Sequence, residues 1–240
     1  MLAQISNMFD AAPTMKKLTP KKSVETRALI LSTALKLFRK NGYAATTMRD
    51  IGAETDLALG SAYYYFPSKE AIVLAYYERV QDEHAAKAAT AMVGHDDLRE
   101  RLGIAMHTKL NLLKRDRDLL AALFGVVANP ASVLSIFGSN TTDVRTESIA
   151  IFELSLGKSP LSPDLRQLLV PTLWFLHMGF LLYFIHDTSS RQRKTRMLVD
   201  GTLDLVVPLI GLAGLPQAAF IRERLLALIR DVGSLPSVSS

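Results

Sequence analysis

The chain has 240 residues, of which 49% are apolar and none is cysteine. This length suits one or two domains, and the lack of cysteine excludes disulfides, thiolate metal sites and cysteine nucleophiles. The formal net charge is +5, and residues 15–70 carry all of that excess, with ten basic and five acidic side chains. Phosphate contacts supply most non-specific affinity for nucleic acid, so this cationic segment predicts a polyanionic partner. A solvated basic tail has the same composition and stays open as an alternative.

The first helix of the chain is predicted over residues 22–40. Residues 1–20 show no hydrophobic periodicity and are expected to form a disordered basic arm. They lack the basic start and apolar run of a signal peptide, so a cytoplasmic protein is expected. The helix has one apolar stripe at three- and four-residue steps, and Gly42 suits a left-handed cap after it. The stripe consists of Val24, Ala28, Leu31, Leu35 and Phe38.

A second helix is expected to begin directly after Thr47. Its hydroxyl can accept a hydrogen bond from the Asp50 backbone N–H, while the Asp50 carboxylate reaches back toward Thr47. A tight turn and a short third helix, residues 59–66, are expected to follow. In that helix Ala62 and Phe66 are predicted to face the core.

The remainder of the chain is also predicted to be helical. Ser68 can cap a long helix that runs to about Ala91. Further helices are expected over residues 96–115, 118–128, 141–156, 163–185, 190–212 and 216–231. The predicted fold class is therefore all-α, with an N-terminal three-helix helix-turn-helix domain and a C-terminal helical domain. The expected boundaries are 1–20 for the arm, 21–68 and 69–232 for the two domains, and 233–240 for a disordered tail.

Residues 168–185 contain no formally charged side chain. This uncharged stretch of 18 residues is at the lower limit of length for a membrane-spanning helix. Pro171, Thr172 and His177 interrupt this single segment. A helix that is apolar on all sides can instead be buried on both sides in a large helical protein. We therefore expect burial and no membrane partner.

Residues 47–66 carry the feature that indicates function, because two short helices joined by a tight turn form a helix-turn-helix. Such a unit lays its second helix in the major groove of DNA. Three adjacent tyrosines, 63–65, span about 300° of a helix, so they cannot all be core, and Tyr64 is the one favoured to be exposed. Simple packing of the tyrosines is the alternative. The predicted DNA-contacting residues are Thr46, Thr47, Arg49, Leu59, Gly60, Ser61, Tyr63, Tyr64 and Lys69.

Within that set the expected roles differ. Ser61, Tyr63 and Tyr64 would reach base edges, phosphates or thymine methyl groups, and Gly60 would permit a close backbone approach. Lys69 would meet a phosphate at the start of the following helix.

Residues 27–73 resemble the DNA-binding domain of the TetR family of repressors. The matching features are Leu37-Phe38, Asn41-Gly42, Thr46-Thr47, Ile51, Gly60, Tyr63 and the run from Phe66 to Glu70. The resemblance implies a repressor that binds a palindromic double-stranded operator as a homodimer and is released by a ligand. The C-terminal half resembles the family only in being helical and of suitable length. The resemblance implies that this helical domain, residues 69–232, is the C-terminal helical ligand-binding and dimerisation domain.

Three residues depart from the family pattern. Gly52 stands where alanine is usual, which should loosen the second helix by up to about 1 kcal/mol. Asp56 stands where glycine is usual and tolerates the left-handed conformation that the turn needs. Ala58 replaces a serine-type cap, at a cost of about 1 kcal/mol.

The other polar residues do not indicate an enzyme. The five histidines, 84, 95, 107, 177 and 186, include no pair at the spacing of a helical metal site. No glycine-rich phosphate loop or nucleophile elbow occurs, so no metal, cofactor or catalytic residue is expected. An enzyme, a structural DNA-bending protein, or a membrane-associated helical protein with a vestigial helix-turn-helix remains the alternative.

The expected effector is a small apolar molecule, because an apolar pocket with a few polar groups suits such a ligand. Ordinary core packing is an equal alternative for each of the candidate wall residues, which are Met106, Asn111, Phe124, Trp174, His177 and Met178. In the resembled family one face of a helix such as 163–185 packs across the dimer, and the sequence leaves open which face does so. The helix Lys69–Ala91 is the expected allosteric lever, since it joins the two domains.

Overall fold

The computed structural model describes residues 20–232, and within that range the chain forms helices and no strand. This confirms the predicted all-α fold. The expected basic arm (Pro20 apart) and the expected C-terminal tail lie outside the described residues. The helices are α1 Pro20–Asn41, α2 Met48–Glu54, α3 Leu59–Tyr65, α4 Lys69–Ala91, α5 Leu98–Leu113, α6 Arg117–Ala128, α7 Thr142–Leu156, α8 Pro163–His186, α9 Arg193–Ala213 and α10 Ala219–Val232. Single 3-10 turns at Ser139–Thr141, Ser190–Gln192 and Pro216–Ala218 precede α7, α9 and α10.

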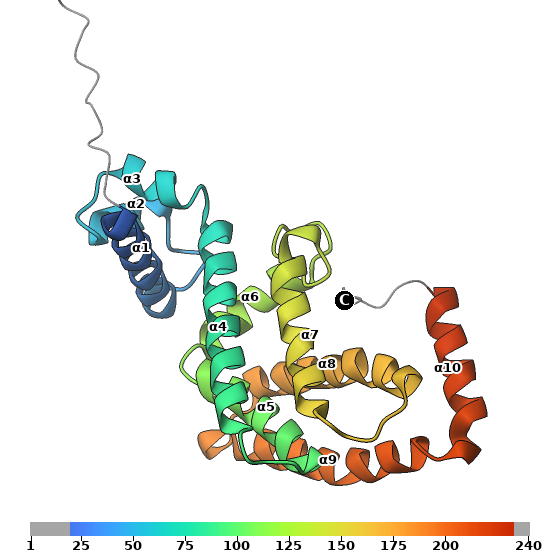
Figure 1. Ribbon diagram of the computed structural model, residues 1–240. Coiled ribbons are helices and arrows are strands. Elements are labelled where there is room, and N and C mark those ends of the chain that lie inside the picture. The colour runs from blue at the N-terminus through green and yellow to red at the C-terminus, as the bar shows by residue number, and fades with distance from the viewer. Residues whose placement is uncertain (1–19, 233–240) are drawn as a thin grey trace, which may run out of the picture.

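The helices form a small N-terminal unit and a larger C-terminal body (Figure 1). Helices α1, α2 and α3 make up the small unit, and α4 runs from it along the larger body. Helix α7 packs against α4, α5 and α8, and α9 packs against α5 and α8. Helix α10 lies at the edge of the body, far from α3 in this view.

One continuous apolar core joins the two parts. It includes Leu35, Ile51 and Phe66 in the small unit and Phe152 and Phe184 in the larger body. Helix α4 contributes Ile72 and Tyr76 near the junction. Because the core is not divided at the junction, a displacement in the larger body can be transmitted to the small unit by packing.

The apolar stripe of α1 is shorter than the sequence pattern suggests. Leu31, Leu35 and Phe38 are buried as expected. Val24 is 70% exposed, and Ala28 is also exposed. Close packing therefore begins near Ile30, and the first turns of α1 keep an apolar side chain in solvent despite the matching period.

Helix α8 is the apolar helix whose burial was expected. By length and composition it is the one described helix that could cross a membrane, while Ser190–Ala213 and Pro216–Leu228 pass the same test only as a pair bent by 91°. It packs against α5, α6, α7, α9 and α10, and its buried residues include Leu173, Trp174 and His177. The face that carries Phe175, Leu182 and Tyr183 is exposed. Only one side of α8 is therefore core within a single chain.

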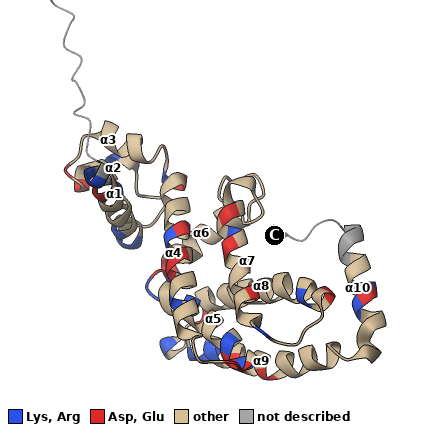
Figure 2. Ribbon diagram, viewed as in Figure 1, with Lys and Arg blue, Asp and Glu red and all other residues tan. Residues whose placement is uncertain are grey.

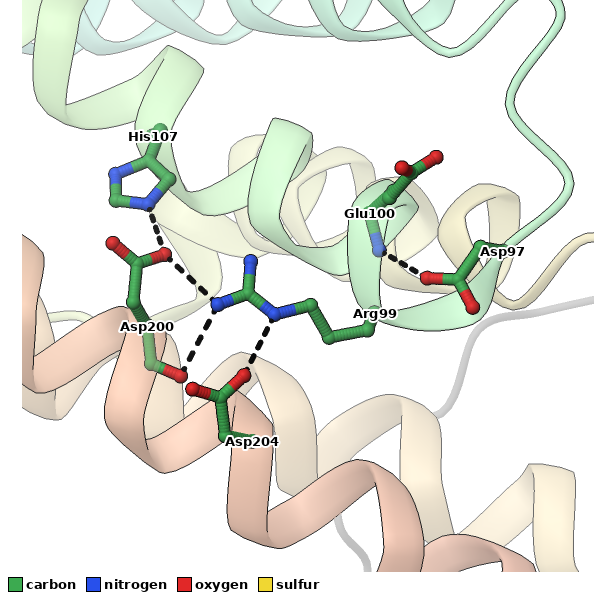
Figure 3. A network of polar contacts seen from close by, with 6 residues as sticks. All are labelled: Asp97, Arg99, Glu100, His107, Asp200 and Asp204. Carbon is green, nitrogen blue, oxygen red and sulfur yellow. Dashed lines mark hydrogen bonds and ion pairs between the residues drawn. The ribbon is translucent and has the colours of Figure 1, made fainter.

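A charged network joins α5 to α9 (Figure 3). Arg99 donates from Nε to Asp204 at 2.9 Å and from Nη2 to Asp200 at 3.3 Å. His107 Nε2 lies 2.9 Å from the same Asp200 carboxylate. Asp97 accepts the backbone N–H of Glu100 and caps α5. These contacts position α9 along the body.

Helix α9 begins at Arg193, three residues later than the pattern predicts. Arg191 and Gln192 have positive φ angles of 53° and 52°, which interrupt regular helix. The buried Asp187 carboxylate accepts hydrogen bonds from the backbone N–H groups of Ser189 and Thr195 and from the Thr195 hydroxyl. This cap lowers the pKa of Asp187 against the effect of desolvation. The local capping chemistry overrides the helical period there.

Candidate nucleic-acid interface

Helix α2 starts with the reciprocal cap that its sequence predicts. The Thr47 hydroxyl oxygen accepts the Asp50 N–H at 3.2 Å, and Asp50 Oδ2 accepts the Thr47 N–H at 2.8 Å. Hydrogen bonds from the Thr47 hydroxyl and backbone hold the pKa of Asp50 below its usual value. The cap fixes where α2 begins, and so fixes the position of the exposed Arg49 beside it.

The turn between α2 and α3 accommodates the departures from the family pattern. Asp56 adopts φ +53°, the left-handed conformation expected of it. Ala58 stands at the N-cap of α3 without a side-chain hydrogen bond. Gly52 is buried, and a Cβ added there would lie 3.5 Å from Leu59 Cα, an ordinary contact distance. The turn is therefore intact although α3 lacks a side-chain cap.

Helix α3 divides its residues between core and solvent as predicted. Ala62 and Phe66 are 0% and 1% exposed. Tyr63 and Tyr64 are 48% and 68% exposed, and Ser61 is half-buried. The two exposed rings are adjacent on one short helix, so they present aromatic surface in one place. Of the three tyrosines, Tyr64 is the most exposed and Tyr65 packs inward with its ring edge against Tyr64.

The start of α3 is open to a close approach. Leu59 is 38% exposed and Gly60 is exposed. A Cβ at Gly60 would meet no atom within 4 Å. Packing within the chain therefore does not require glycine at this position. The open space outside α3 is compatible with the close backbone approach that the sequence predicts there.

Besides Thr47, whose hydroxyl is engaged with Asp50, two more residues of the predicted contact set form hydrogen bonds within the chain. Thr46 is fully buried, and its hydroxyl donates to the Gly42 carbonyl at 2.8 Å. Lys69 donates to the carbonyl oxygens of Tyr43 and Ala44 at 2.8 and 3.4 Å, and its Nζ lies 4.5 Å from the centre of the Tyr43 ring. Thr46 therefore shapes the loop before α2, and Lys69 ties that loop to α4.

The charge of this unit lies beside α3 rather than on it. Figure 2 shows basic residues along α1, whereas α3 carries no charged side chain. The exposed Arg49 lies on α2. Lys36 is paired with Glu54 at 2.9 Å. The exposed Arg49 and the basic residues of α1 therefore lie outside α3, which is itself uncharged.

A polar junction between the small unit and α6 could not be predicted from any sequence motif. Asp116, 5% exposed, accepts hydrogen bonds from Arg39 Nε of α1 and from the Tyr76 hydroxyl of α4, the latter at 2.8 Å. Burial first, then the Asp116 charge and hydrogen bond, raise the pKa of Tyr76. One carboxylate therefore connects α1, α4 and the start of α6.

The predicted wall residues of an effector pocket separate into two groups. Met106, Trp174 and His177 are buried in the body, and Met178 is half-buried. Phe124 is 43% exposed. Asn111 is exposed and accepts a hydrogen bond from Arg196 at 2.7 Å. Only the first group lies together in the interior of the body.

A helix-turn-helix unit on a separate helical body defines a class of DNA-binding proteins, and comparison with known proteins identifies the family. Residues 30–76 match the family described as bacterial regulatory proteins, tetR family. Residues 101–222 match the family described as tetracyclin repressor-like, C-terminal domain. The second match alone covers more than half of the chain, so this protein belongs to the TetR family.

Curated relatives align mainly over the N-terminal unit. The HTH-type regulator YuxN of Bacillus subtilis is 44% identical over 59 residues, which are 23% of this chain and 20% of that protein. The repressor KstR of Mycolicibacterium smegmatis is 33% identical over 96 residues, 40% of this chain and 47% of that protein. The aligned part thus spans between a fifth and a half of these relatives.

Solved structures share the fold over most of the chain. A TetR transcriptional regulator from Nitrosomonas europaea has a TM-score of 0.61 at 18% identity, covering 75% of this chain and 97% of that one. The FadR repressor of Thermus thermophilus, solved in complex with lauroyl-CoA, has a TM-score of 0.54 at 20% identity, covering 75% and 93%. At these identities the likeness concerns the fold alone.

Proposed function

We propose that this protein is a cytoplasmic transcriptional repressor that binds a palindromic operator as a homodimer and is released by a small-molecule effector. The observation that carries the proposal is the uncharged helix α3, which presents Tyr63 and Tyr64 to solvent beside the cationic α1. Aromatic rings with hydroxyl groups can contact both thymine methyl groups and phosphates. The family membership supports the same function.

The proposed contacts fall into two kinds. Ser61, Tyr63 and Tyr64, with Leu59 and Gly60 beside them, would lie in the major groove. Thr47 and Arg49 at the start of α2 would meet the phosphate backbone. Lys69 has one N–H left beyond its two carbonyl contacts, which would serve a phosphate, and Thr46 acts only by placing the loop.

Homodimerisation is supported by the apolar surface that a single chain leaves open. Besides the exposed face of α8, both α9 and α10 carry large exposed apolar side chains. They are Met197, Leu198, Leu205, Leu209 and Leu212 on α9 and Phe220, Ile221, Leu225 and Leu228 on α10. A monomer rarely exposes so extended an apolar surface, and a second copy of the chain would cover it.

Release by an effector would work through α4 and the Asp116 junction. Helix α4 leaves the DNA-binding unit and packs against α5 and α7 in the body. A two-fold operator fixes the separation of the two α3 helices, so a swing of α4 would cost contacts in both half-sites. A coupling of about 1–3 kcal/mol would weaken operator binding about 5–150-fold.

Selection of bound fragments from the genome tests the proposal. We expect the protein to retain a small set of fragments. Lys69→Ala should weaken binding to all of them about equally. Tyr64→Ala and Ser61→Ala should change the order of preference among fragments. Retention of no sequence above background would refute sequence-specific binding, and equal profiles for all three variants would refute the assigned roles only.

Release is tested by thermodynamic linkage. An effector that lowers operator affinity by some factor must itself bind less tightly by the same factor when the operator is present. Titration of the protein with the effector, with and without a selected fragment, measures that factor. Equal effector affinity in both titrations would refute ligand-controlled release.

A further inference from the structure

Four polar side chains from three helices meet in the interior of the larger body. Gln81 and His84 come from α4, Lys109 from α5 and His177 from α8. Their exposed fractions are 1%, 1%, 9% and 1%. We refer to these four residues as the buried basic cluster. Residues of these types are seldom buried without partners, and Lys almost never is.

The hydrogen bonds of the buried basic cluster are incomplete. Lys109 Nζ donates to Gln81 Oε1 at 2.9 Å. His84 Nε2 lies 2.8 Å from the Ala105 carbonyl oxygen, which can only accept, so His84 carries its proton on Nε2. Among the described residues, Gln81 Nε2, His84 Nδ1 and both ring nitrogens of His177 have no hydrogen-bond partner. Buried polar groups are normally paired, so four such atoms in one place require a reason.

All three titratable groups of the cluster are bases. Desolvation is the cause that lowers the pKa of Lys109 to about 7. Desolvation, and then the charge of Lys109, lower the pKa of His84 to about 4. The pKa of His177 is also lowered, first by burial and then by His84 and Lys109. No carboxylate contributes to any of these three shifts, so the cluster has basic groups and no counter-ion among the described residues.

Apolar side chains surround the cluster. The Phe152 ring centre lies 5.5 Å from that of His177, and the His84 and His177 rings are stacked at 6.3 Å. Met106 and Trp174 are buried one helical turn from Lys109 and His177 respectively. The surroundings therefore suit a ligand that is apolar apart from one charged end.

We propose that the buried basic cluster binds the anionic head group of an amphipathic organic acid, which is the effector of this protein. Lys109, the Gln81 amide and one N–H of His177 would donate to the anion, and His84 Nδ1 would take up a proton beside it. This inference rests on the proposed ligand-released function and narrows its effector from an apolar molecule to an organic acid. Charge-assisted hydrogen bonds of this kind are about twice as strong as neutral ones.

The position of the cluster connects binding to release. Gln81 and His177 are almost inaccessible, so a head group reaches them only when α8 moves relative to α4 and α5. Helix α4 begins directly after the DNA-binding unit, and its first buried residues share the core of that unit. Insertion of an anion between α4 and α8 therefore selects an arrangement with a displaced α4, which is the requirement for an effector.

The test uses matched acids and neutral amides as probes of the full-length protein. Butyrate, octanoate, dodecanoate and phenylacetate are each compared with the corresponding primary amide. Trp174 is the single tryptophan of the chain and lies on α8 beside the cluster, so its emission reports binding without DNA. We expect at least one acid to bind, and its amide to bind about tenfold more weakly or less well still, because the ion pair is lost.

Two lysine variants separate the cluster from general charge effects. Lys109→Met should weaken binding of that acid about tenfold or more and leave the amide unchanged. Lys114→Met, an exposed lysine at the end of the same helix, is the matched control and should bind the acid as the native protein does.

Three results would overturn the inference. The first is that none of the acids, whatever its chain length, changes the Trp174 emission. The second is that each acid and its amide bind with the same affinity. The third is that Lys109→Met binds the acid as tightly as the native protein does. A lowered melting temperature of Lys109→Met together with unaltered acid binding would assign the lysine to stability alone. If an acid binds to the buried basic cluster but does not release the selected DNA, the acid site stands and its role as the effector site is refuted. If the protein retains no DNA fragment at all, the proposed function is refuted independently of acid binding.

Discussion

Replacing Asp116 by alanine removes the acceptor that joins α1, α4 and the start of α6. The Tyr76 hydroxyl, on a side chain only 1% exposed, would lose its partner. A buried hydroxyl left unpaired costs about 1–3 kcal/mol. The Arg39 side chain is 41% exposed and can be hydrated again, so its lost ion pair adds only about 0–1 kcal/mol. We therefore expect Asp116→Ala to lower the free energy of unfolding by about 1–4 kcal/mol.

Equilibrium urea unfolding, followed by circular dichroism and by Trp174 emission, measures this loss. Adding Tyr76→Phe to Asp116→Ala should restore part of the stability, since both buried polar partners are then gone. Asp118→Ala, an exposed carboxylate in the same first turn of α6, is the control and should cost no more than about 1 kcal/mol. Equal losses for Asp116→Ala and Asp118→Ala, or no recovery in the double variant, would refute the junction as a stabilising contact.

Three further predictions concern other parts of the molecule. Gly52→Ala should raise the free energy of unfolding, measured in urea, by about 0.5–1 kcal/mol, because its Cβ meets only ordinary contacts. Gly42→Ala, at φ +88°, should lower that free energy. A lower free energy of unfolding for Gly52→Ala would contradict the first of these two predictions. The pKa of Lys109 is about 7 in the folded chain and 10.5 in the unfolded one, so the unfolded chain binds more protons between these values and stability should rise with pH across that window. Lys109→Met should lack this rise, and an identical pH profile would refute the assignment. Phe175→Glu on the exposed face of α8 should convert a dimer to a monomer in light scattering, while Val93→Glu, at a 79% exposed residue in the turn after α4, should not; a dimer in both would place the interface on another face.

The helix-turn-helix could be predicted because its signals are local. The Thr47–Asp50 cap and the left-handed Asp56 each depend on residues within one turn, and the structure contains both. The inward positions of Ala62 and Phe66 follow from the helical period in the same way. Short-range rules therefore sufficed for the candidate interface except at Thr46 and Lys69, whose partners lie in a loop.

For the larger C-terminal body, the sequence could predict only that it is helical. Helix α8 is apolar on every side, so its period does not distinguish the core face from the exposed face of Phe175. Lys109 gives no sign of burial in sequence, because a lysine on an amphipathic helix is normally in solvent. Asn111 and Phe124 are exposed because the helices that carry them turn those residues away from the body, which only tertiary packing decides.

Hydroxyl-radical footprinting on a fragment selected from the genome tests whether a homodimer reads DNA through α3. Such a dimer should protect two half-sites related by two-fold symmetry and about one helical turn of DNA, roughly 34 Å, or a multiple of it, apart. On a fragment that the native protein prefers, protection should weaken in both halves together when Tyr64 is replaced by alanine. A single protected site, or protection that does not depend on Tyr64, would contradict a homodimer that reads DNA through α3.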